Sequence, residues 1–370
     1  MSTYIFVLGK DPELSMAELL ARYPESKPQM KCADFVLLDL KKPLSQKEFD
    51  QLGGQIKAGK VFDTADKKYL VPKIADHLSV EHYAGKLNYG VSVYGWSEKN
   101  LRALLPDLKK EFKRRGISSR FVNQHFLNIS AAQHKGLSGG KEVLVCKEGP
   151  DFHLAEVVAV QDIDAYSKRD YEKPFRDMKV GMLPPKLAQI MINLTGSEGA
   201  IWDPFCGGGV LIMEGLLMGH KMLGSDIDEE TLQGAKRNVE WVKKEFAVKT
   251  TAELFAHDAT DPVPLKQFDA IACEGYLGPP QNRLRSKREF APLVSRLSQL
   301  YQLFFAALKS AGFKGSVVIG LPFYRTREGE LELSEVIRGA EKTGFRKELD
   351  LKYARKDQLV GRQILRFRLV

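Results

Sequence analysis

Long hydrophobic runs and paired cysteines are both missing from this chain of 370 residues. No apolar stretch approaches the roughly 18 residues that a membrane-spanning helix requires, so we expect no transmembrane segment. The N-terminus has no basic residues ahead of its short apolar stretch, which indicates a first strand and not a signal peptide. Cys32, Cys146, Cys206 and Cys273 are scattered without a Cys-x-x-Cys pair. This argues against a disulfide scaffold or a cysteine-rich zinc site and favours the reducing cytoplasm.

Extensive disorder is not expected either, because hydrophobic residues make up 44% of the chain and charged residues 28%. The length predicts two or three domains. The charge is moderately one-sided, with 56 Lys and Arg against 47 Asp and Glu, a net charge of +9. Such a balance favours an acidic partner such as a nucleic acid, but a total of this size is a weak signal.

One local cluster of basic residues stands out between residues 99 and 120. The basic residues there are Lys99, Arg102, Lys109, Lys110, Lys113, Arg114, Arg115 and Arg120. Apolar residues recur at Leu101, Leu104, Leu105, Leu108 and Phe112, which is helical spacing, so the basic side chains fall on the opposite face. This face is either a solvated helix surface or a stripe that contacts phosphates; the candidate contacts are Lys109, Lys110, Lys113, Arg114 and Arg115. A second basic run over residues 283–288 adds Arg283 and Arg285 as candidates.

The pattern of expected elements changes along the chain. The first 165 residues mix short strands and helices, typical of an α+β region with small sheets; one of the strands is expected over residues 121–126. Residues 166–183 are polar and charged and are interpreted as a linker. Strands and helices then alternate regularly from a helix over 186–194 to a strand over 315–319. This alternation predicts an α/β fold with a doubly wound parallel sheet.

The strongest motif is Asp203-Pro204-Phe205-Cys206-Gly207-Gly208-Gly209, which ends the first strand of that sheet. It is neither a dinucleotide fingerprint nor a P-loop, and an acid before the glycines suits a cationic ligand group. It resembles the Asp-Pro-Phe-Cys-Gly-Ser-Gly motif of S-adenosylmethionine (SAM) methyltransferases that act on exocyclic amines of nucleic acids. Asp203, Phe205, Gly207 and Gly209 are therefore candidate cofactor-binding residues.

Two more carboxylates end the next two expected strands. Asp226, followed by Ile227, is placed to accept hydrogen bonds from ribose hydroxyls. Asp228 is interpreted instead as the cap of the following helix. By the resemblance, Asp258, followed by Ala259, would accept from the adenine amino group. Asp226, Ile227, Asp258 and Ala259 are thus further candidate cofactor residues.

The fourth strand ends in Glu274-Gly275-Tyr276-Leu277, where the resembled family has Asp/Asn-Pro-Pro-Tyr/Phe. An exocyclic amine is a poor nucleophile because its lone pair is delocalised into the ring. An acid and a backbone carbonyl that accept its two hydrogens localise that lone pair, and an aromatic ring stacks on the extruded base. The candidate catalytic residues are Glu274, the Gly275 carbonyl and Tyr276. The departure from the family pattern leaves retained and lost activity both open.

Four segments (residues 4–19, 52–57, 161–170 and 176–194) resemble tRNA guanine-N2 methyltransferases that modify position 10. The resemblance implies a ferredoxin-like segment at 1–62, a THUMP-like RNA-binding domain at 63–165, the linker at 166–183 and a Rossmann-like class I methyltransferase domain at 184–370. It implies SAM as cofactor, tRNA as partner, and direct methyl transfer without a metal. Residues 182–186 form either a wall of the cofactor pocket or only a helix start. Two alternatives stay open: a DNA amino-methyltransferase acting on N6-adenine or N4-cytosine, and a catalytically weak RNA-binding homologue. The need for a small activating subunit is also open.

Overall fold

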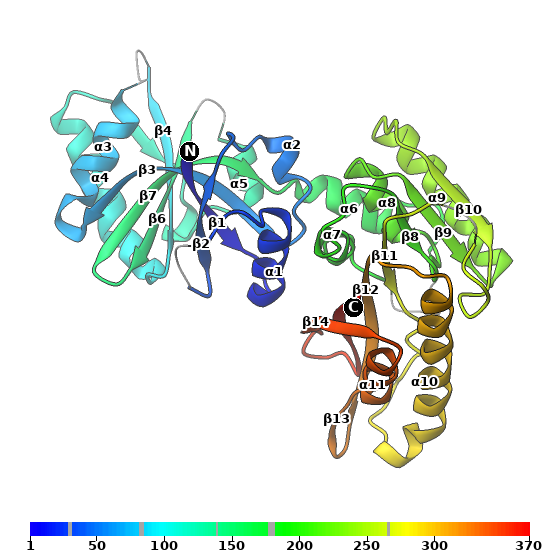
Figure 1. Cartoon of the computed structure of the whole chain (residues 1–370). Helices are drawn as coiled ribbons and strands as arrows, with labels where there is room; N and C mark the ends of the chain where they lie inside the picture. The colour runs from blue at the N-terminus through cyan, green and yellow to red at the C-terminus, as the bar shows by residue number, and fades with distance from the viewer. Residues whose placement is uncertain (29–31, 81–84, 138–139, 177–181, 265–266) are drawn as a thin grey trace. The chain divides into compact units, whose positions relative to one another are not determined.

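The computed structural model describes residues 1–28, 32–80, 85–137, 140–176, 182–264 and 267–370. The chain divides into two compact units, Met1–Ala165 and Tyr166–Val370, and each is described by itself (Figure 1). No helix of the described residues is both long and apolar enough to cross a bilayer.

The first unit is built on one seven-stranded sheet. Its elements are β1 (Ser2–Leu8), α1 (Pro12–Arg22), β2 (Phe35–Leu40), α2 (Gln46–Phe49), β3 (Gln55–Asp66), α3 (Leu70–Ser79), β4 (Leu87–Tyr94), α4 (Leu101–Arg114), β5 (Ser119–Phe121), α5 (Ala131–Lys135), β6 (Lys141–Glu148) and β7 (Asp151–Val160), with short 3-10 turns between some of them. The strand order is β2-β1-β3-β7-β6-β4-β5, with parallel pairing only of β4 with β5 and with β6.

This sheet corrects two expectations. The small separate sheets are one continuous sheet, and the boundary between residues 62 and 63 falls inside β3. Strand β3 pairs with β1 on one side and β7 on the other, so its hydrogen bonds join the two expected halves. The strand expected over 121–126 is also wrong, because β5 ends at Phe121 and a 3-10 turn follows over Gln124–Phe126.

Helix α4 has the amphipathic character that its sequence predicts. Leu101, Leu104, Leu105, Leu108 and Phe112 are all buried in one core with residues of α3, β4 and β6. The exposed face carries the basic side chains, since apolar residues at this spacing occupy one side of the helix.

The second unit contains a larger, mixed sheet. Its elements are α7 (Pro185–Leu194), β8 (Ile201–Asp203), α8 (Val210–Leu217), β9 (Met222–Asp226), α9 (Glu229–Glu245), β10 (Ala252–Ala256), β11 (Ala270–Glu274), α10 (Lys287–Ser310), β12 (Ser316–Thr326), β13 (Gly329–Leu331), α11 (Ser334–Lys342), β14 (Phe345–Tyr353) and β15 (Val360–Leu369). The strand order is β10-β9-β8-β11-β12-β15-β14, and β13 pairs with β12 outside this path.

The expectation of a purely parallel sheet needs correction. Strands β8 to β12 of the main path are parallel, but β15 is antiparallel to both β12 and β14, and β13 is antiparallel to β12. Helices α10 and α11 pack their apolar residues in one core with strand residues such as Ile271 and Val317. Helix α8 contacts α7 on one side and α9 on the other, and all three helices contact strands of the sheet (Figure 1).

The expected linker at 166–183 is not an unstructured connection. Helix α6 (Ile163–Tyr171) occupies its first part. Arg169 of α6 is buried, and its Nε donates to Oε1 of the buried Glu214 in α8 at 2.7 Å. Gln189 of α7 donates to the other oxygen of that carboxylate at 3.0 Å. This segment is therefore tied into the second unit by a buried ion pair.

Candidate functional site

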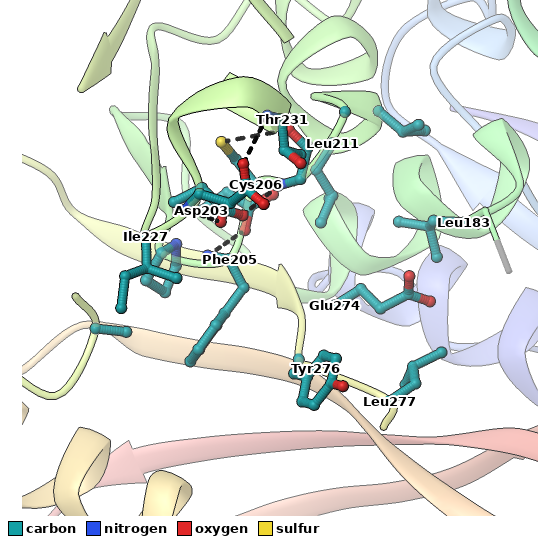
Figure 2. A pocket seen from close by; sticks show the side chains of 18 of the residues that line it. Leu183, Asp203, Phe205, Cys206, Leu211, Ile227, Thr231, Glu274, Tyr276 and Leu277 are labelled. Atoms are coloured by element: carbon teal, nitrogen blue, oxygen red, sulfur yellow. Dashed lines mark hydrogen bonds between the residues drawn. The ribbon is translucent and has the colours of Figure 1, made fainter. Parts of the chain in front are cut away.

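A cavity of about 500 Å³ opens at the carboxyl ends of the parallel strands in the second unit (Figure 2). Ten of the eleven predicted cofactor and catalytic residues line it, namely Asp203, Phe205, Gly207, Asp226, Ile227, Asp258, Ala259, Glu274, Gly275 and Tyr276. Gly209 is not among the lining residues; it is the N-cap of α8. A cavity of this size at this edge of an α/β sheet has the location and volume typical of a small-molecule site.

The glycine loop (residues 203–209) follows β8 and is shaped by backbone hydrogen bonds. Gly207 and Gly209 have φ angles of 48° and 78°, in the left-handed region where a side chain is strained. The Gly207 N–H donates to Oδ2 of Asp226 at 2.8 Å, and the Cys206 N–H donates to the Ser225 carbonyl at 2.9 Å. The ends of β8 and β9 are thus joined across the cavity floor.

The carboxylates of the cavity form an electronegative site. Asp203 is buried, and its Oδ1 accepts from the Phe205 N–H at 3.1 Å. Burial raises the pKa of Asp203, and the negative charges of Asp226 and Glu274 add to the rise. Three acids around one cavity stabilise a positively charged ligand group, which would in turn favour their ionised forms.

Asp228 and Asp258 have local structural roles as well. Oδ1 of Asp228 accepts from the Thr231 N–H at 3.0 Å and caps α9, as predicted. Oδ1 of Asp258 accepts from the N–H and the hydroxyl of Thr260 at 2.9 and 2.8 Å. These bonds fix the direction of the Asp258 carboxylate at the cavity wall.

Several lining residues were missed by sequence reasoning. Phe175 reaches the cavity from the expected linker and is held by Asn238 of α9: its N–H donates to Oδ1 at 2.8 Å, and its carbonyl accepts from Nδ2 at 2.9 Å. The same Nδ2 donates to the Gly208 carbonyl at 2.8 Å. Met182 and Leu183, by contrast, were candidates for the pocket wall and do line the cavity, and helix α7 begins just after them at Pro185. Residues 177–181 of that resembling stretch lie outside the described residues. An asparagine inside a helix carries no motif, so only the fold reveals this link.

Glu274, at the end of β11, is paired with an arginine that the sequence did not single out. Nε of Arg362 in β15 donates to Oε1 of Glu274, and the two side chains are 3% and 17% exposed. Burial raises the pKa of Glu274, and the Arg362 guanidinium opposes that rise. In Figure 2 Glu274 lies between Leu183 and Tyr276.

The departure at Gly275 has a structural reason. Its N–H donates to the Gly320 carbonyl at 3.0 Å, a bond that proline cannot make. A Cβ at this position would lie 2.3 Å from the hydroxyl oxygen of the buried Tyr301. That hydroxyl donates to the Tyr276 carbonyl at 2.9 Å, and the Tyr324 hydroxyl donates to the Leu277 carbonyl at 2.8 Å. The acid loop (residues 274–278) is therefore held by two tyrosines, and Tyr276 keeps a 49% exposed ring at the cavity.

The two buried thiols near the site are poor nucleophiles. Burial raises the pKa of both Cys206 and Cys273 well above the ordinary value for cysteine. Only the thiolate is strongly nucleophilic, so the site favours direct transfer over a cysteine-linked intermediate.

The predicted basic stripe on α4 is partly committed to ion pairs. Nε and Nη2 of Arg114 donate to Glu111 at 2.8 and 2.7 Å. Arg115 is more enclosed: it donates to Glu111 at 2.7 Å and to Asp76 of α3 at 2.6 Å. Lys109, Lys110 and Lys113 are exposed. Lys110 also pairs with Asp107 at 3.2 Å, and Arg114 stays exposed despite its ion pair. Arg115 therefore joins α4 to α3, and the three lysines and Arg114 form the accessible part of the stripe.

The second basic run lies beside the end of β12. Arg283 is exposed and pairs with Glu289 at 2.9 Å. Arg285 forms an isolated parallel bridge with Thr326, and its carbonyl accepts from the Arg327 N–H at 3.1 Å. The fold thus brings Arg327 to the run, although some forty residues separate them in the sequence.

Residues 174–319 match the family model described as an RMKL-like methyltransferase domain. The chain is also similar to the tRNA (guanine(10)-N2)-dimethyltransferase of Pyrococcus abyssi, with 35% identity over 156 residues, which are 39% of this chain and 46% of the relative. The enzyme of the same name from Methanothermobacter thermautotrophicus is 32% identical over 126 residues, 33% of this chain and 35% of that one. The matches thus span less than half the length of these curated relatives.

Solved structures that resemble the whole chain include the following two. TrmN from Thermus thermophilus has a TM-score of 0.57 at 14% identity and covers 100% of both chains. A possible methylase from Clostridium difficile 630 has a TM-score of 0.52 at 13% identity and covers 99% of this chain and 97% of the other. These likenesses show the fold of the chain, and the family model describes residues 174–319 of the second unit as a methyltransferase domain.

Proposed function

We propose that the chain transfers a methyl group from SAM to the exocyclic N2 amine of a guanosine in tRNA, with position 10 as the favoured site. The observation that carries this proposal is that two groups of residues line one cavity. The first group is Asp203, Asp226 and Asp258, and the second is Glu274, Gly275 and Tyr276. Acids suited to a cationic cofactor and groups suited to an amine are thus within reach of each other.

The cavity fits the cofactor in size and in chemistry. Asp203 and the backbone of Gly207 would hold the methionine part of SAM. Asp226 would hold the ribose and Asp258 the adenine. Ile227, which is 72% exposed, and the buried Ala259 would add apolar contacts. When bound, SAM supplies an electrophilic methyl group: the N2 lone pair forms the new C–N bond as the C–S bond breaks, and the nitrogen then loses a proton.

The acid loop would hold the acceptor amine. Glu274 and the Gly275 carbonyl accept its hydrogens and so localise the nitrogen lone pair. The exposed Tyr276 ring is positioned to stack on a base that has left its helix. Because the Tyr276 and Leu277 carbonyls are already bonded to tyrosines, the loop needs little reorganisation when the base arrives.

RNA contacts are proposed in both units. In the first unit, residues 63–165 would act as the THUMP-like module together with residues 1–62, which share its sheet. Lys109, Lys110 and Lys113, and to a smaller extent Arg114 and Arg115, would contact phosphates. In the second unit, Arg283 and Arg285 would contact phosphates next to the acid loop. The scattered, unpaired cysteines are consistent with activity in the cytoplasm.

The two other candidates are less well supported. A DNA amino-methyltransferase would share the acids of the cavity, but the curated relatives carry names that specify tRNA guanine. A catalytically weak homologue would not require a loop that two tyrosines and an arginine hold against the cavity.

The test is incubation of the protein with labelled SAM and unmodified tRNA, followed by digestion to nucleosides. We expect label in N2-methylguanosine. Label in N6-methyladenosine would overturn the base assignment. Preferential labelling of duplex DNA in a parallel reaction would favour the DNA methyltransferase, and tRNA binding without transfer would favour the weak homologue.

A further inference from the structure

We infer that Arg362 keeps Glu274 a group that only accepts hydrogen bonds. Glu274 then selects guanine because this base presents two adjacent N–H donors. Arg362 is thereby assigned as a positioning and specificity-determining residue. This inference rests on the proposed function and deepens it, since it names the feature of the base that the site reads. It starts from the ion pair at the end of β11 and concerns a residue outside every motif of the sequence.

The sheet register shows how Arg362 reaches Glu274. Glu274 lies opposite Gly320 of β12, and Arg362 lies opposite Pro322 on the same strand. Gly320 and Pro322 are two residues apart and therefore share a face of the sheet with Glu274 and Arg362. Since Gly320 has no side chain, no side chain of β12 stands between Glu274 and Arg362 at this position.

A second contact fixes the arginine at the cavity. Nη2 of Arg362 donates to the carbonyl of Met182, a lining residue, at 3.4 Å. Nε donates to Oε1 of Glu274. That bond engages Oε1, and Glu274 itself lines the cavity. The arginine thus orients the carboxylate from behind and leaves acceptor capacity toward the cavity.

Base edges differ in the pattern that such a carboxylate meets. The guanine edge presents N1–H beside the N2 amine, two parallel donors that match the two oxygens of a carboxylate. Adenine and cytosine present an amine beside a ring nitrogen that accepts. An ionised carboxylate that faces this ring nitrogen would place two hydrogen-bond acceptors opposite each other. A buried acceptor without a donor is unfavourable, so these bases would bind more weakly than guanine.

The ionisation state of Glu274 is therefore part of the selectivity. The groups that interact with it electrostatically are Arg362, Asp203, Cys273 and Tyr301. Burial favours the protonated acid, which would present a donor and an acceptor and match adenine or cytosine instead. Arg362 is the cation in this group and opposes protonation.

The experiment compares the full-length protein with Glu274→Gln, Arg362→Met and Arg362→Lys, using unmodified tRNA and labelled SAM over a pH series. Arg366→Met is the matched control, because Arg366 lies on the same strand and pairs with Glu348, which is not a lining residue. Calorimetric SAM binding and thermal unfolding are measured for every variant to confirm folding.

We expect Glu274→Gln to lower kcat/KM for guanosine by about 10²-fold or more, because its amide NH2 opposes a guanine donor. Arg362→Met should move the acidic limb of the kcat/KM profile to higher pH, and Arg362→Lys should restore most of the original profile. Arg366→Met should keep the original pH profile and the original SAM affinity.

Two results would overturn the inference while the proposed function stands. One is guanosine methylation by Glu274→Gln at the unchanged rate. The other is an unshifted pH profile in a folded Arg362→Met protein. If the unchanged protein fails to methylate tRNA guanosine, the proposed function itself is wrong and the inference fails with it.

Discussion

Two loops at the same edge of the second sheet are held in different ways. The glycine loop is held from 19 and 30 residues away, because Gly207 donates to the Asp226 carboxylate and the Gly208 carbonyl accepts from Asn238. The acid loop is held by Tyr301, Tyr324 and Arg362, which lie 25, 47 and 88 residues away. A recognisable motif therefore encodes most of the first geometry, whereas the second depends on the assembled fold.

The largest expected effect concerns the glycine loop. Asp203→Ala should weaken SAM binding by about 10- to 100-fold, because a hydrogen bond to a charged group contributes about 1.5–3 kcal/mol. Calorimetry measures the change. Asp261→Ala is the control, since this nearby acid is exposed and does not line the cavity. Equal affinities for the two variants would remove Asp203 from the cofactor site.

The acid loop should respond to crowding at Gly275. Gly275→Ala places a Cβ against the Tyr301 hydroxyl and should destabilise the protein by about 1–3 kcal/mol, with a larger loss of kcat than of SAM affinity. Tyr301→Phe in the same protein removes the clashing oxygen and should restore part of the loss. Thermal unfolding and single-turnover rates report both effects. A Gly275→Ala protein with unchanged turnover would show that this packing does not control the loop.

Within the glycine loop, two adjacent glycines should behave differently. Gly207→Ala must adopt a φ of 48° and should cost about 1–2 kcal/mol. At Gly208 a Cβ would meet the Phe175 ring at 3.4 Å without a positive φ, so Gly208→Ala should cost less. Denaturant unfolding compares the two. Equal stabilities would contradict the assignment of backbone strain to Gly207.

The smallest effect is that of pH on cofactor binding. Because the pKa of Asp203 is raised, this carboxyl binds a proton at a higher pH than an ordinary aspartate does. SAM affinity should therefore decrease severalfold from neutral to mildly acidic pH, as the negative charge that attracts the cationic cofactor is lost. Asp203→Asn should show a flatter dependence in the same titration. A pH-independent affinity of the unchanged protein would contradict this role of Asp203.

The sequence predicts the parts of the site that follow a local pattern. Each of Asp203, Asp226 and Asp258 ends a strand or follows one directly, and parallel strands bring their carboxyl ends to one edge. Arg362 carries no such signal, because it lies within an antiparallel strand that the βα alternation does not predict. In the sequence, Gly275 in place of proline weakens the match to the family motif. In the structure, the Tyr301 hydroxyl leaves no room for a side chain at residue 275, and no sequence spacing encodes that contact.

The placement of β15 has a consequence for the order in which the site becomes complete during synthesis. Every residue that lines the cavity has been translated once the ribosome passes Leu300. The positive charge that pairs with Glu274 belongs to Arg362 of β15. This strand is translated later and must insert between β12 and β14. Until then the nascent domain carries a carboxylate that it cannot bury at low cost, since an unpaired buried charge is strongly unfavourable. Closure of the sheet and neutralisation of the Glu274 charge thus depend on the same strand.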